Sequence, residues 1–174
     1  MKQNRLQESI DEIVDIVACA GGELIGRTRL QKTVFLLSSM GLSERKFHFS
    51  YKHYGPFSDS LASMADIAQL FGGLEEVQQR SSWGGTYSVF RTKAKQRNGS
   101  SAARLQVIEI SKNANAIDLE LAATAAFLAS EGCEDPWAET ASRKPEKRDR
   151  IATAKALYKK FFAVQSPRQL PNIP

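Results

Sequence analysis

Apolar residues recur at helical spacing over five stretches of the chain. In the first stretch, Leu6, Ile10 and Ile13 fall on one stripe, which predicts an amphipathic helix that ends at Gly21-Gly22. Glycine also follows the next three stretches directly or within two residues, as expected at helix C-termini. The predicted helices cover residues 4–19, 27–40, 58–71, 115–130 and 146–162.

Alternating and short apolar runs predict the strands. The aromatic residues within 47–51 alternate with polar ones, which indicates a half-buried strand. This strand is expected to stop at a Gly55-Pro56 turn, because proline cannot continue a strand ladder. Two further runs flank a Ser- and Gly-rich turn and predict a β-hairpin, and a later run predicts a third strand. These runs are residues 74–77, 87–90 and 105–110.

The order helix, short strand, turn, helix and hairpin is typical of a winged-helix core. We therefore expect a mainly helical α+β protein, with a winged-helix-like core, a small β-hairpin wing and a C-terminal helical lobe. The expected division is a winged-helix-like domain over residues 1–110 and a helical lobe packed on it over 111–163. Residues 164–174 contain three prolines and predict a flexible, extended tail.

The 174 residues carry a net charge of +5, and the charges fall into blocks. Residues 80–104 hold six basic residues and no acid, whereas residues 109–139 hold seven acids and one lysine. Such separated blocks suit a charged partner or pairing between parts of the chain. No apolar run approaches the ~20 residues that span a bilayer. The N-terminal residues lack signal-peptide features, and two distant cysteines suggest no disulfide framework, so a cytoplasmic protein is expected.

The sequence offers no catalytic constellation. The two histidines, His48 and His53, have opposite parity on the predicted strand, and no cysteine or carboxylate lies beside them at ligand spacing. No P-loop, dinucleotide fingerprint or nucleophile elbow occurs. We expect no metal, no cofactor and no enzymatic activity.

The outward positions of the helix at 58–71 carry acids, serines and no Lys or Arg. In a helix-turn-helix this second helix would enter the major groove, where acidic residues oppose the phosphates that supply most of the affinity. The helix therefore suits a protein partner better. The acidic face of the first helix is a second candidate surface, although a solvated face is the simpler interpretation. The candidate partner-binding residues are Ser58, Asp59, Ser63, Asp66, Gln69, Asp11 and Asp15.

Basic residues elsewhere keep a nucleic-acid alternative open. They lie in the first turns of the helix at 27–40 and along and after the second hairpin strand. Contact would then go through the wing to phosphates rather than through a reading helix. The candidate residues are Arg27, Arg29, Lys32, Arg91, Lys93, Lys95 and Arg97.

Four segments in this order resemble a known family. They are Arg29–Leu37 (RLQKTVFLL), Tyr54–Ser58 (YGPFS), Gly73–Val77 (GLEEV) and Leu119–Leu128 (LELAATAAFL). Together they resemble the YwgA-like bacterial proteins and, more loosely, the Panacea antitoxin domain of the SocA type. The resemblance covers roughly residues 4–163.

The resemblance implies a winged-helix-like core with a C-terminal helical lobe in a bacterial, cytoplasmic, non-enzymatic protein. Panacea-type proteins neutralise diverse toxins by direct protein contact. We therefore expect a protein-binding module, an antitoxin or regulatory component of a toxin–antitoxin or phage-defence system that neutralises a partner protein. The alternative is a winged-helix transcriptional regulator that contacts nucleic acid through a basic wing. The sequence leaves the partner and the oligomeric state open.

Overall fold

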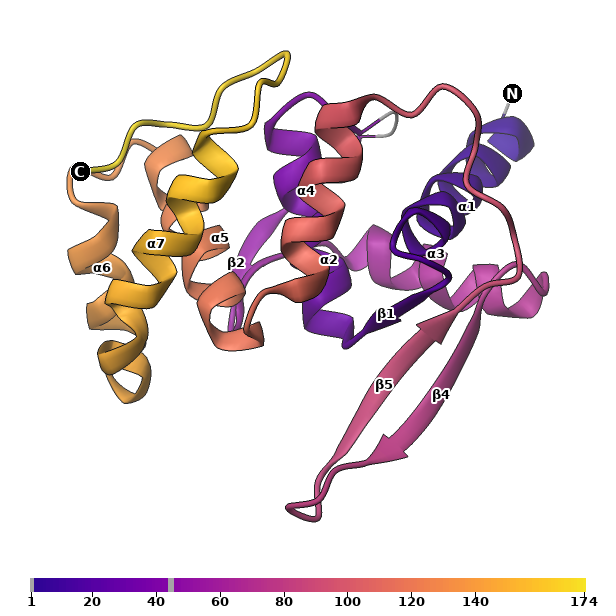
Figure 1. Cartoon of the computed structure of the whole chain (residues 1–174), viewed down its shortest axis with the longest axis horizontal. Coiled ribbons are helices and arrows are strands. Elements are labelled where there is room, and N and C mark those ends of the chain that lie inside the picture. Colours follow the sequence, from indigo (N-terminus) through magenta and orange to yellow (C-terminus); the bar gives the residue numbers. More distant parts are fainter. Residues whose placement is uncertain (1, 44–45) are drawn as a thin grey trace.

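The computed structural model describes residues 2–43 and 46–174, and over these residues the chain is a mainly helical α+β protein (Figure 1). The helices are α1 (Lys2–Cys19), α2 (Arg27–Ser39), α3 (Asp59–Leu70), α4 (Ala102–Asn113), α5 (Ala116–Ser130), α6 (Pro136–Arg143), the 3-10 helix η1 (Pro145–Arg150) and α7 (Ile151–Phe162). The strands are β1 (Glu23–Ile25), β2 (Ser50–Lys52), β3 (Gly55–Phe57), β4 (Glu75–Arg80) and β5 (Thr86–Arg91). Among the described residues, no helix has the length and apolar character needed to cross a membrane.

The larger sheet is antiparallel and has the strand order β1-β5-β4. Its β4–β5 hairpin confirms the predicted β-hairpin and projects away from the helices (Figure 1). The third strand is β1, which pairs Leu24 with Phe90. The strand predicted over residues 105–110 is wrong, since these residues belong to α4. Arg104, Val107, Ile108 and Ser111 are its buried positions, a helical i, i+3, i+4, i+7 face.

The smaller sheet is the β2–β3 hairpin, which corrects the predicted Gly55-Pro56 turn. Pro56 lies within β3 and pairs with Tyr51 of β2, so the chain turns at His53 and Tyr54 instead. A proline is tolerated there because each strand of a two-stranded sheet has an edge that needs no N–H donor. The strand predicted from residue 47 is shorter than expected and begins at Ser50.

The core centres on α5, which is buried over its whole circumference from Asp118 to Ala126. Its alanines let α2, α6, α7 and β3 approach closely. One hydrophobic cluster includes residues from both predicted parts of the chain, such as Ile13 of α1 and Phe161 of α7. The C-terminal residues from 164 onward pack on this core: Leu170 is buried, and the Tyr158 hydroxyl donates to the Pro171 carbonyl at 2.6 Å.

A buried ion cluster joins α1 to α4 and corrects the prediction of a solvated acidic face. Glu12 and Asp15 are fully buried, and the buried Arg104 guanidinium donates to both carboxylates at 2.9 Å and 3.0 Å. Arg97 adds a bond to Glu12 at 2.9 Å, and its N–H donates to Asp15. Burial raises the pKa of Asp15, but these bonds outweigh it, so the pKa is lowered overall.

We predict that Gly55→Ala destabilises the protein more than Gly132→Ala does. Both glycines have φ near +85°, where an alanine costs about 1–2 kcal/mol. A Cβ at Gly55 would also lie 2.3 Å from Thr124 Oγ1, whereas a Cβ at Gly132 meets nothing within 4 Å. Overpacking of this kind adds about 1–3 kcal/mol. Urea unfolding of both variants measures the difference, and equal losses would contradict the close approach of β3 to α5.

Candidate partner-binding surface

Two of the sequence motifs meet in the interior and fix the start of α3. The buried Gln31 amide donates to the Ser58 carbonyl at 3.0 Å and accepts from the Ser58 N–H at 2.9 Å. The Lys32 ammonium, which is 1% exposed, donates to the Pro56 carbonyl at 2.8 Å. The RLQK and YGPFS segments are therefore two halves of one hydrogen-bonded unit that joins α2 to β3 and α3.

Ser58 is the N-cap of α3, because its hydroxyl accepts from the Leu61 N–H at 3.3 Å. It is fully buried, so Ser58 is an architectural residue and its predicted role as a surface contact is wrong. Asp59, Ser63 and Asp66 are exposed and share the i, i+4, i+7 spacing of one helix face.

This face ends on two apolar residues that the sequence did not single out. Leu70 is 86% exposed and Phe71 is 70% exposed, although continued helical spacing from Ala68 would place Phe71 on the buried face. The Gly73 N–H donates to the Ala68 carbonyl and the Gly72 N–H to the Gln69 carbonyl, which is a Schellman motif. The motif turns the chain so that Leu74, and not Phe71, enters the core. We call Asp59, Ser63, Asp66, Leu70 and Phe71 the α3 stripe.

Ion pairs offset part of the negative charge of the α3 stripe. Asp59 accepts from Lys52 at 2.6 Å, and Asp66 accepts from Arg27 at 3.0 Å. Arg27 also pairs with Glu76 of β4, and hydrogen bonding to Glu76 raises the pKa of Arg27 above its ordinary value. All but Glu76 are substantially exposed, so these pairs contribute little to stability and can be exchanged for a partner's charges.

Gln69 and the first helix contribute less than predicted. The Gln69 amide is half-buried and donates to the Ala65 carbonyl and to Glu76. Asp11 is exposed and accepts from Gln7 at 2.8 Å. Asp15 lies inside the ion cluster with Arg104 and is not at the surface, because the guanidinium compensates its buried charge.

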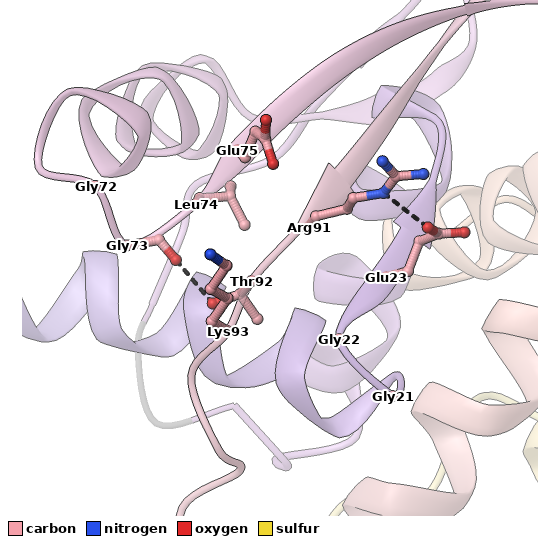
Figure 2. A pocket seen from close by; sticks show the side chains of 10 residues that line it. All are labelled: Gly21, Gly22, Glu23, Gly72, Gly73, Leu74, Glu75, Arg91, Thr92 and Lys93. Carbon is pink, nitrogen blue, oxygen red and sulfur yellow. Dashed lines mark hydrogen bonds and ion pairs between the residues drawn. The ribbon is translucent and has the colours of Figure 1, made fainter.

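A cavity of about 590 Å³ adjoins the apolar end of the α3 stripe (Figure 2). Two glycine turns line it, Gly21-Gly22 and Gly72-Gly73, together with the end of β5. Thr92 joins the turns, since its N–H donates to the Gly22 carbonyl at 3.0 Å and its hydroxyl to the Gly73 carbonyl at 2.8 Å. The cavity therefore has a fixed wall, which includes the Gly72-Gly73 turn that directly follows the α3 stripe.

The lining of this cavity has no dominant charge. Glu23 and Arg91 form an ion pair at 2.9 Å, and Figure 2 shows their side chains pointing toward each other. Glu75 and Lys93 are exposed and contribute one charge of each sign. Leu74 adds an apolar wall. A site of this character suits a side chain of a protein partner better than a strongly charged ligand.

Five of the seven candidate nucleic-acid residues form ion pairs or hydrogen bonds within the chain. Besides Arg27 and Arg91, Arg97 joins the ion cluster, and Lys32 is buried. Arg29 donates to the backbone carbonyls of Ile25, Ser111 and Ala114 at 2.6–2.9 Å, and burial lowers its pKa. Lys93 and Lys95 are exposed, and neither has a partner among the described residues.

Within residues 2–43 and 46–174, no group of three or more His, Cys, Asp or Glu side chains could hold a metal ion.

No family model matches the chain, and neither a curated protein nor a solved structure matches it. The assignment of the surface therefore depends on its own geometry. One sequence signal could have located Leu70 and Phe71: Gly72-Gly73 followed by Leu74 is the pattern of a Schellman motif with its apolar C-terminal contact.

We predict that Lys32 makes stability rise with pH above neutrality. Burial, together with Lys144 and Lys147, lowers the pKa of Lys32 from its ordinary 10.5 to about 7, although Glu120 opposes the shift. Between these values the unfolded chain binds more protons than the folded chain does. The free energy of unfolding should therefore increase by up to about 1.4 kcal/mol per pH unit from this group.

Urea unfolding at pH 7, 8 and 9 tests this prediction. Lys32→Met lacks the titrating group. The free energy of unfolding of the wild type minus that of this variant should therefore increase with pH. The exposed Lys95→Met is the matched control and should follow the wild type at every pH. If this difference in the free energy of unfolding stays constant with pH, the pKa of Lys32 is not lowered in the folded protein.

Proposed function

We propose that this chain is a non-enzymatic protein-binding module that neutralises or regulates a partner protein. In this proposal it is an antitoxin or regulatory component of a toxin–antitoxin or phage-defence system. The observation that carries the proposal is the α3 stripe, where a helix face of acids and serine ends on the exposed Leu70 and Phe71.

An exposed Leu–Phe pair beside a cavity has the properties of an interface centre. Exposed apolar side chains gain free energy when a partner removes them from water, by about 25 cal/mol per Å². Aromatic residues are enriched at the centre of interfaces, and the polar residues around them exclude water. In the α3 stripe, Asp59, Ser63 and Asp66 would supply the polar rim, and the cavity lined by the following Gly72-Gly73 turn would receive a partner side chain.

The order of elements supports a winged-helix-like assignment. The sequence helix, strand, helix, helix, strand, strand is present in α1–β1–α2–α3–β4–β5, with β1 beside β5 in the sheet. The β2–β3 hairpin is an addition between α2 and α3. In such an arrangement α3 would be the helix that reads DNA, and its exposed acids Asp59 and Asp66 oppose that role.

The antitoxin part of the proposal depends on the resemblance to the YwgA-like and Panacea-type proteins. The RLQK and YGPFS motifs that carry this resemblance bond to each other through Gln31, Lys32 and Ser58. The two motifs are expected to occur together, because the side chains of one bond to the backbone of the other. What the resemblance adds is direct contact with a protein toxin as the mode of action.

We predict that Phe71→Ala and Leu70→Ala each weaken partner binding at least ~10-fold without loss of thermal stability, as expected of exposed residues at an interface centre. The probe is the product of the neighbouring gene, co-expressed and purified, with affinity measured by calorimetry. Trp83→Ala is the matched control, because Trp83 is 79% exposed but lies at the far turn of the hairpin. If Trp83→Ala abolishes binding while both α3 variants bind normally, the α3 stripe is not the interface.

The nucleic-acid alternative retains one favourable observation, the free and exposed Lys93 and Lys95. Two phosphate contacts would give a salt slope of only about −2 in log K against log salt on duplex DNA. We predict a slope no steeper than this in fluorescence anisotropy with a duplex of random sequence. A slope near −5 that becomes shallower by about 2 in Lys93→Gln/Lys95→Gln would instead support a nucleic-acid regulator.

A further inference from the structure

We propose that the chain binds a nucleotide in a second cavity, between the β2–β3 hairpin and the α6–η1 segment. This cavity has a volume of about 860 Å³, within the range of small-molecule sites. Tyr51, Lys52 and Tyr54 line it from the hairpin, and Arg143, Lys144 and Lys147 line it from the other side. It shares no lining residue with the α3 stripe, although its Lys52 pairs with Asp59 of the stripe, and the inference does not depend on the proposed function.

Two lysines of this lining share one buried carboxylate. Glu120 of α5 is buried and accepts from Lys144 at 2.6 Å and from Lys147 at 2.8 Å. Glu146 also lines the cavity, but it is exposed and lies 4.0 Å from Lys147. Lys32 adds little positive charge above neutral pH, because its pKa is lowered to about 7. Buried charges are normally compensated, so two ammonium groups on one buried carboxylate favour an added anion.

Lys32 would respond to an anion bound in this cavity. It lines a smaller cavity that shares Lys52, His53 and Tyr54 with the larger one. Besides burial, the groups that act on it are Glu120, Lys144 and Lys147, and Arg27 lies in the same lining. An anion held by Lys144 and Lys147 would reduce their repulsion of Lys32. Binding should therefore be accompanied by proton uptake near neutral pH.

The aromatic residues indicate that the anion carries a planar ring. Tyr54 is 56% exposed, and its ring centroid lies 5.4 Å from the Lys147 ammonium and 5.9 Å from that of Lys144. His53 meets it edge-on at 5.9 Å. Arg143 covers Tyr51 at 4.5 Å, whereas the two lysines lie farther from the more exposed Tyr54 ring, so Tyr54 is the ring that a base can reach. A base stacked on Tyr54 would place a phosphate beside the lysines.

Calorimetric titration of the full chain with ATP, AMP, pyrophosphate and adenosine tests the proposal. We expect ATP and AMP to bind, pyrophosphate to bind more weakly and adenosine to give no heat. Tyr54→Ala should weaken ATP and AMP at least ~10-fold but leave pyrophosphate unchanged, since stacking is worth about 1–3 kcal/mol per base. Lys147→Gln should weaken all three anions. Lys95→Gln, an exposed lysine outside the cavity, is the control and should bind as the wild type does.

Proton uptake provides a readout that needs no variant. The observed heat of ATP binding at pH 7.5 should change with the ionisation enthalpy of the buffer. If Lys147→Gln fails to fold, Tyr54→Ala and shifts of the Tyr54 and His53 ring signals in the wild type decide the question. Absence of binding by ATP, AMP and pyrophosphate at millimolar concentration overturns the proposal. So does pyrophosphate binding as tightly as ATP with no effect of Tyr54→Ala.

Discussion

The buried contacts of Gln31 and Lys32 with the backbone at residues 56–58 are the constraint on which the rest of the structure depends. They hold β3 and the first turn of α3 against α2, with two bonds to Ser58 and one to the Pro56 carbonyl. On the far side, Gly55 brings β3 against Thr124 of α5, where a Cβ would not fit. The position of the α3 stripe follows from this arrangement, because α3 begins directly after the fixed Ser58 cap.

Most charged residues of the interior serve this architecture. Arg104 neutralises Glu12 and Asp15, and Arg29 satisfies backbone carbonyls at the end of α4. Within the basic block of residues 80–104, Arg91, Arg97 and Arg104 pair with acids of the chain, which reduces the number of cations open to a phosphate backbone. The apolar end of α3 and the cavity lined by Tyr54, Lys144 and Lys147 are the surfaces on which the two proposals depend.

The five predicted helices were recognisable because their apolar stripes are local patterns, and the β4–β5 hairpin was recognisable from its turn residues. The helix α4 was missed, since its short apolar run at 105–110 also fits a strand. The errors share a different cause. The β1 strand has three residues and is defined only by its pairing with β5. Asp15 looks solvated on its own helix, and its partner Arg104 lies 89 residues away in sequence. Phe71 falls on the inner face by helical spacing, but the Schellman turn exchanges it for Leu74. In each case a distant partner or a single turn outweighs periodicity.

The central claim is that the end of α3 is where a protein partner docks. Hydrogen–deuterium exchange of the chain, alone and in complex with the product of its neighbouring gene, tests this most directly. If a partner docks there, the complex should show new protection of backbone amides from about residue 66 to residue 75, with little change at the hairpin turn around Trp83. Protection confined to residues 80–97, with none at the end of α3, would contradict it.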